Sequence, residues 1–105
     1  MNIFISQPIS GINKHEYWTT RVRLESYCKA RYMQPKFVNY LISTEPDGNV
    51  YKHPDLWYVA KSLDQLAKAD VFVILKGADL FSKGCKIEKQ CAELYGIPVD
   101  KASIV

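Results

Sequence analysis

Short apolar runs alternate along the chain with longer stretches in which apolar residues recur at helical spacing. Three of the runs, at residues 2–6, 36–42 and 71–75, have the length of β-strands. The third is apolar throughout, which is typical of a strand that is buried on both faces. A short last strand is expected near the C-terminal end, at Ile97 and Val99, with Ile104 and Val105 as further candidates.

Two helices have clear N-terminal signals. Asn13, followed three residues later by Glu16, is a capping-box pattern and predicts a first helix over residues 14–31. Pro54 suits the first position of a second helix. The apolar residues of this second helix form the clearest amphipathic stripe in the chain: Leu56, Val59, Ala60, Leu63, Leu66 and Ala67.

A third helix is expected to begin at Gly84, after a loop over residues 76–83. Gly96 is a natural residue to end it, and Pro98 prevents the helix from continuing. Its inward-facing residues are predicted to be Ile87, Cys91 and Leu94.

The predicted order of elements, β-α-β-α-β-α-β, is typical of an α/β protein with a parallel sheet covered by helices. Right-handed crossovers place the first and third strands side by side at the centre. We therefore expect a flavodoxin/Rossmann-like three-layer sandwich with a four- to five-stranded parallel sheet. The 105 residues are expected to form a single domain, 1–105.

Composition narrows the class of partner. The formal charge of +3 is spread along the chain with charges of both signs, which makes nucleic acid an unlikely partner. Cys28, Cys85 and Cys91 have no CxxC spacing, so neither a disulfide framework nor a metal site is expected. No apolar run is long enough for a membrane span, and Met1 leads directly into a strand, which predicts a cytoplasmic protein without a membrane partner.

The predicted fold also locates a functional cleft. In open parallel sheets, ligands bind beyond the carboxyl ends of the strands, where the strand order reverses. The loops at that point are residues 7–11 and 76–84. Both contain glycine and lead into helices whose N-terminal amides can hold an anion, but neither is a P-loop or a GxGxxG motif. Asp79 lies in the second loop, where a role in the site and a role in shaping the turn are both open.

Glu88 is the candidate catalytic residue. It lies near the start of the third helix, beside the face that is predicted to be buried. A carboxylate at the mouth of a cleft can act as a nucleophile or as an acid/base. An ordinary surface glutamate in the first turns of a helix would have the same spacing, so both interpretations stay open at this point.

Several motifs resemble one known family. An aspartate opens an apolar strand, glycine follows a loop, glutamate comes four residues later, and the helix ends in glycine and proline. In this chain the pattern is Ala69-Asp70, Gly84, Glu88, Ala92 and Gly96-Ile97-Pro98-Val99. It resembles the signature of the nucleoside 2-deoxyribosyltransferase-like family. The opening Ile3-Phe4-Ile5-Ser6-Gln7-Pro8-Ile9-Ser10-Gly11 is similar to the family's first strand and substrate loop, and Leu56-Trp57-Tyr58-Val59-Ala60-Lys61-Ser62 to a small, often phage-encoded branch.

The resemblance implies a chemistry. In the family, the glutamate attacks C1′ of a deoxyribosyl group, the base leaves, and water or another base resolves the glycosyl-enzyme; no metal or other cofactor is needed. Glu88 would be that nucleophile, and Ser82 matches the serine that related deoxynucleoside 5′-monophosphate N-glycosidases use near the phosphate. With the two loops, the predicted substrate-binding set is Ser6, Gln7, Pro8, Ser10, Gly11, Asp79, Ser82 and Gly84.

The chain differs from the family pattern at three positions. Gln90 replaces a frequent glycine, Ser62 occupies the position of an aspartate that orients the sugar, and Ser10 replaces the arginine of the glycosidases. Three functions are therefore weighed. The first is an N-glycosidase or deoxyribosyltransferase, the second is a non-catalytic module that binds a nucleotide or a nucleotide-derived signal, and the third is a structural interaction protein.

A homo-oligomer, dimeric or larger, is also expected. A chain this short buries a small share of its surface, and family members commonly complete their clefts across subunits. The aromatic candidates for such a contact are Tyr17, Trp18, Trp57 and Tyr58. Because Trp57 and Tyr58 are adjacent and cannot share one helix face, only one of them is expected in the core.

Overall fold

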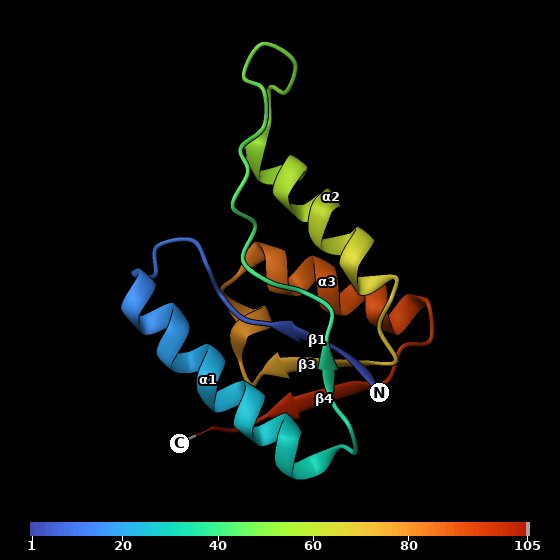
Figure 1. Ribbon diagram of the computed structural model, residues 1–105. Helices are drawn as coiled ribbons and strands as arrows, with labels where there is room; N and C mark the ends of the chain where they lie inside the picture. The colour runs from blue at the N-terminus through green and yellow to red at the C-terminus, as the bar shows by residue number, and fades with distance from the viewer. Residues whose placement is uncertain (105) are drawn as a thin grey trace.

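The computed structural model describes residues 1–104. Four strands and three α-helices alternate along the chain, with one short 3₁₀ helix (Figure 1). Their bounds are β1 Asn2–Ser6, α1 Lys14–Arg31, β2 Lys36–Phe37, α2 Pro54–Leu66, β3 Val71–Leu75, η1 Ala78–Leu80, α3 Lys83–Leu94 and β4 Val99–Ala102. The predicted α/β class and the parallel sheet are confirmed.

The sheet has four strands in the order β2-β1-β3-β4, and all of its pairs are parallel. The first and third strands are neighbours, as predicted, with Ile3 opposite Val71 and Ser6 opposite Ile74. The strand order reverses between these two strands, so the loops that follow them diverge from one point at the carboxyl edge.

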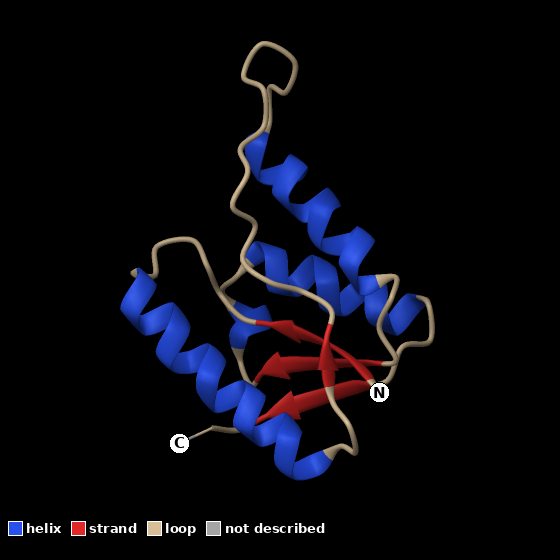
Figure 2. Cartoon of the chain, in the orientation of Figure 1, coloured by secondary structure: helices blue, strands red, loops and turns tan. Residues whose placement is uncertain are grey.

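Helices cover both faces of the sheet (Figure 2). The alternation of side chains along β1 builds both cores. Ile3 and Ile5 pack with Leu24 and Cys28 of α1 on one face. On the other face, the cluster that contains Phe4 also includes residues of α2 and α3, and the rings of Phe4 and Phe72 stack with centroids 5.6 Å apart. These layers make a three-layer sandwich.

The second strand is shorter than the predicted residues 36–42, and Asn39 explains why. The ladder ends with the bond from the Val38 N–H to the Ile3 carbonyl, 2.9 Å long. The side chain of Asn39 then takes over the pairing: its Oδ1 accepts from the Ile5 N–H at 2.8 Å, and its Nδ2 donates to the Ile5 carbonyl at 2.7 Å. The backbone is thereby free to leave the sheet, and residues 40–42 are not part of a strand.

The segment that leaves the sheet runs beside α2 and ends in a turn that extends beyond the rest of the molecule (Figure 1). The predicted amphipathic stripe of α2 is only partly buried. Leu66 is the one buried residue of the helix, and Leu56 remains 60% exposed. Trp57 and Tyr58 are both half-buried and contact each other edge to face, with ring centroids 5.0 Å apart, so neither lies in the core as was predicted for one of them.

The third helix begins one residue before the predicted Gly84, because the Ser82 side chain caps it by accepting from the Cys85 N–H at 3.3 Å. The predicted buried face was only partly right, since Cys91 packs against the core and Ile87 is half-buried. The buried residues are Cys85, Glu88 and Ala92, whereas Leu94 is 81% exposed. The loop that was predicted over residues 76–83 contains the 3₁₀ turn η1.

The last strand begins at Val99, and Ile97 packs against the core from the preceding turn. Ile104 follows the strand and packs on the α1 side of the sheet, whereas Val105 lies outside the described residues. No helix within residues 1–104 combines the length and hydrophobicity that a membrane span requires.

Candidate functional site

A hydrogen bond between Ser6 and Glu88 joins the central strand β1 to the helix α3 at the carboxyl edge of the sheet. Ser6 is the last residue of β1 and Glu88 lies in the second turn of α3. The Ser6 Oγ donates to Glu88 Oε1 at 2.7 Å. Glu88 is only 9% exposed and Ser6 1%, so the pair is almost removed from water. Glu88 is therefore not an ordinary surface glutamate.

Burial sets the acidity of this carboxyl. Desolvation disfavours the charged form and raises the pKa of Glu88 to about 7, while the hydrogen bond from the Ser6 hydroxyl and the nearby Ser62 hydroxyl oppose the rise. Ser62 is on α2, so three elements converge on one carboxyl. It occupies the position where the family pattern has an aspartate, and it contributes a neutral hydroxyl there.

Cys85 belongs to the same cluster, although the sequence analysis gave it no role in the site. Its thiol is buried beside the hydroxyls of Ser6 and Ser82, which favour the thiolate, but burial raises the pKa of Cys85 overall. Cys85 and Glu88 are three residues apart on one helix and therefore share a face. That spacing is the signal by which the sequence could have placed Cys85 beside Glu88.

Three further buried residues lie towards α1: Gln7, Tyr17 and Arg21. The Gln7 Nε2 donates to the Tyr17 carbonyl at 3.1 Å. Burial raises the pKa of the Tyr17 hydroxyl; the Arg21 guanidinium opposes this rise, and the Glu88 carboxyl adds to it. The electrostatic influence of Glu88 therefore reaches the first helix, which the sequence analysis did not include in the site.

The other predicted site residues are less closely connected to Glu88. Pro8 is buried, but Ser10 and Gly11 are exposed, and Gly11 has a φ of +77°, which favours glycine. Within residues 1–104, no hydrogen bond or ion pair links Ser10 or Gly11 to Glu88. Asp79 forms an ion pair with Lys89, with 3.4 Å between Oδ2 and Nζ. A methyl group added at Gly84 would meet no heavy atom within 4 Å, so there is space over this part of the helix.

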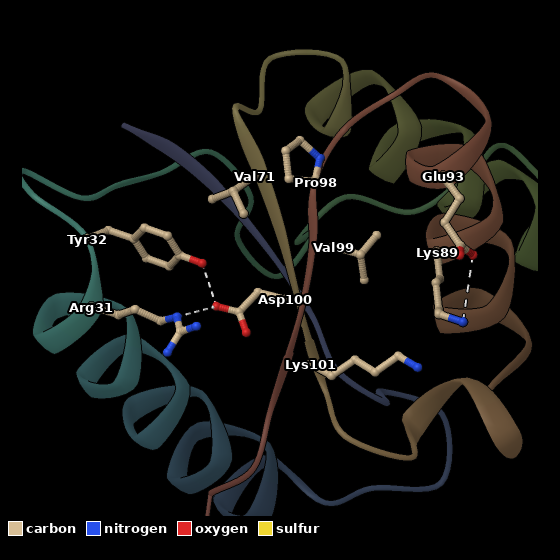
Figure 3. A pocket seen from close by; sticks show the side chains of 9 residues that line it. All are labelled: Arg31, Tyr32, Val71, Lys89, Glu93, Pro98, Val99, Asp100 and Lys101. Carbon is tan, nitrogen blue, oxygen red and sulfur yellow. Dashed lines mark hydrogen bonds and ion pairs between the residues drawn. The ribbon is translucent and has the colours of Figure 1, made fainter.

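Two surface hollows lie elsewhere. One, of about 500 Å³, follows β4 and is lined on either side by the end of α1 and by α3 (Figure 3). The Asp100 side chain in this hollow already accepts hydrogen bonds from the hydroxyls of Tyr27 and Tyr32. It also forms an ion pair with Arg31, with 3.0 Å between Oδ2 and Nε. These contacts fasten the end of α1 to the edge strand. The second hollow, of about 440 Å³, is lined by residues of α1 and by Ile104. Neither hollow includes Ser6 or Glu88 in its lining.

No family model, curated protein or solved structure matches the chain. Among residues 1–104, no group of three or more His, Cys, Asp or Glu side chains is placed to hold a metal ion. A carboxyl whose pKa is about 7, between two hydroxyls, can serve as a nucleophile, exchange a proton, or form hydrogen bonds to a ligand.

Proposed function

We propose that the protein is an N-glycosidase or deoxyribosyltransferase that acts on a deoxynucleoside or deoxynucleoside monophosphate, with Glu88 as its nucleophile. The observation that supports this most directly is the buried Glu88 carboxyl, hydrogen-bonded by Ser6 at 2.7 Å at the carboxyl edge of the central strands. The resemblance of residues 3–11 and 69–99 to the deoxyribosyltransferase-like family supports the same reaction.

The proposed reaction has two steps. A Glu88 oxygen attacks C1′ of the sugar as the bond between C1′ and the base nitrogen breaks, and the base leaves with the electron pair of that bond. A water molecule, or the nitrogen of a second base, then attacks C1′ as the bond between C1′ and the Glu88 oxygen breaks, and Glu88 leaves as a carboxylate. The attacking water or base loses one proton, which balances the proton that the departing base takes up. Both transition states resemble an oxocarbenium ion, as in retaining glycoside hydrolysis. A buried carboxylate stabilises such a cation more strongly than one in water does.

The hydroxyls of Ser6 and Ser62 have a defined task in this proposal. Because they stabilise the charged form of Glu88, they lower its pKa relative to what burial alone would give. The Ser6 hydroxyl, which donates to Glu88 Oε1, also restricts the orientation of the carboxyl. Positive charge that develops on the sugar would favour the ionised carboxylate further.

A second candidate function is supported by the same pKa. At neutral pH a carboxyl with a pKa of about 7 is protonated in roughly half of the molecules, and a protonated carboxyl is not a nucleophile. The site would then be a non-catalytic module in which Glu88 and the two serines hold the hydroxyls or ring nitrogens of a nucleotide.

Incubation with deoxynucleosides and their 5′-monophosphates, followed by measurement of released base, separates the two functions. We expect the wild type to release base and Glu88→Gln to do so about a thousandfold more slowly or worse. Glu93→Gln is the matched control, because Glu93 lies on the same helix but is exposed. Intact-mass measurement of the wild type should show a glycosyl adduct with a slow substrate. Binding without base release would favour the module, and neither binding nor release would exclude both functions.

A further inference from the structure

The Gln7 side chain contains the one buried side-chain polar atom in residues 1–104 that lacks a hydrogen-bond partner, its Oε1. Gln7 is only 7% exposed, and its Nε2 already donates to the Tyr17 carbonyl. A buried amide oxygen without a partner is unfavourable, and such groups in native proteins are uncommon. The residue that follows is Pro8, which has no N–H to offer.

The orientation of this amide is fixed by its neighbour. A carbonyl oxygen such as that of Tyr17 can only accept, so the amide nitrogen must face it. Rotating the amide by half a turn would place two oxygens against each other. The atom that remains free is therefore an acceptor, and only a donor can satisfy it.

Gln7 also stands at the right place for a ligand contact. It follows Ser6, the hydrogen-bond partner of Glu88, and begins the loop that leaves the carboxyl end of β1. Successive side chains at the end of a strand point to opposite faces. Ser6 reaches Glu88 on the α3 side, whereas Gln7 reaches α1. The two residues thus lie on opposite faces at the end of β1, beside the point where the strand order reverses.

We infer that Gln7 determines specificity by accepting a hydrogen bond from an N–H or O–H group of the ligand that binds at Glu88. The inference rests on the proposed function, because it takes the ligand to be a deoxynucleoside or its monophosphate. The inference takes the donor to be one of two groups in such a ligand, an exocyclic amino group of the base or the 3′-hydroxyl of the sugar. A site built around an acceptor rejects analogues that lack the donor, since the acceptor is then left unpaired.

Matched ligand pairs distinguish these two groups. For the base, the pairs are 2′-deoxyadenosine with purine 2′-deoxyriboside, 2′-deoxyguanosine with 2′-deoxyinosine, and 2′-deoxycytidine with its analogue lacking the 4-amino group. For the sugar, the pair is 2′-deoxyadenosine with 2′,3′-dideoxyadenosine. Binding by calorimetry and base release are both measured for the wild type, for Gln7→Met, and for Gln90→Met, a control at an exposed glutamine.

We expect the wild type and Gln90→Met to prefer the donor-bearing member of at least one pair by about tenfold or more, and Gln7→Met to lose that preference. Equal binding of both members of every pair by the wild type would overturn the inference, as would a preference that survives in Gln7→Met. Selective binding without base release would leave the inference standing and exclude the proposed catalysis. Base release without selectivity would do the reverse, and the absence of any binding would exclude both.

The melting temperature of ligand-free Gln7→Met provides a second measurement. Methionine removes the unpaired oxygen together with the bond to Tyr17, so we expect a change of no more than a few degrees. A fall of about ten degrees or more would show that the amide is part of the folded core rather than a ligand contact, and would overturn the inference.

Discussion

At the scale of the residue, the role that we propose for Glu88 and its position in the fold place opposite demands on its charge. A nucleophile needs a free, ionised carboxylate, whereas a helix packed on a sheet needs its inner face to be neutral. Burial raises the pKa of Glu88 to about 7, and the hydroxyls of Ser6 and Ser62 limit the rise. The group is therefore close to the boundary between its two protonation states at neutral pH, where an acid or base is most effective.

The raised pKa of Glu88 predicts a specific pH dependence of stability. In the unfolded chain the carboxyl titrates at about 4.5, so between that pH and 7 the folded state binds more protons than the unfolded state. The contribution of Glu88 is present at low pH and is lost as the pH rises through about 7, and amounts to about 3 kcal/mol in total. Glu88→Gln, which imitates the neutral form, should therefore gain stability over the wild type as the pH rises.

Chemical denaturation of both proteins at about pH 5 and about pH 8 measures this effect. The comparison between the proteins cancels the other titrating groups. Glu93→Gln, at an exposed position on the same helix, serves as the control. A wild type that follows Glu88→Gln at both pH values would show that the carboxyl titrates as an ordinary exposed glutamate does.

At the scale of the element, Asn39 decides where the sheet ends. Its amide presents a donor and an acceptor at the spacing of a backbone strand and binds both polar groups of Ile5. The buried Arg21 holds the adjacent backbone, because its guanidinium donates to the Asn39 carbonyl at 2.8 Å and lies over the rings of Phe37 and Tyr40. The backbone at Asn39, where the segment leaves the sheet, is therefore held by both Ile5 and Arg21.

Replacement of Asn39 by alanine should destabilise the fold by about 2 kcal/mol, because two hydrogen bonds are lost and the Ile5 groups are left without a protein partner. Urea denaturation measures the change. Asn49→Ala is the matched control, since Asn49 is exposed, and should stay within about 0.5 kcal/mol of the wild type. Equal effects of the two substitutions would show that the Asn39 amide does not replace strand pairing.

The same residue shows what the sequence could and could not predict. The strands at 2–6 and 71–75 and the helix at 14–31 follow from local periodicity and capping, and each was predicted with its bounds. Residues 40–42 have the composition of a strand, and only the side-chain pairing of Asn39 with Ile5, 34 residues away, removes them from the sheet. Local pattern contains no information about such a contact.

Part of the candidate site could likewise be predicted from the sequence, and part could not. Topology placed Ser6 and Glu88 at one edge of the sheet, and the structure joins them by a hydrogen bond across 82 residues. The inward face of α3 was predicted from its apolar residues alone. The observed buried face is centred on Cys85, Glu88 and Ala92 instead. Glu88 lies on the inner face with a hydrogen bond from Ser6, and a prediction from apolar periodicity cannot include a buried glutamate of this kind.

At the scale of the whole molecule, the N-terminal half of α2 and the turn before it project from the rest of the structure (Figure 1). They extend beyond the sheet (Figure 1) and expose apolar side chains at Val50, Tyr51 and Leu56. The strongest amphipathic stripe in the sequence thus lacks a complete apolar partner within the described residues. A second copy of the chain is the partner that we expected from the small size of the domain.

The prediction is that the protein forms a homodimer or larger assembly through α2, and that Leu56→Glu dissociates it. Leu56 is 60% exposed in the single chain, so a charge there should leave the monomer folded while opposing burial of the helix against a partner. Light scattering coupled to size-exclusion chromatography measures the mass, and circular dichroism confirms folding. Met33→Glu, at an exposed apolar residue after α1, is the control and should keep the assembled mass. A wild type that is monomeric at about 100 μM, a concentration at which even a weak micromolar dimer would form, would contradict the prediction.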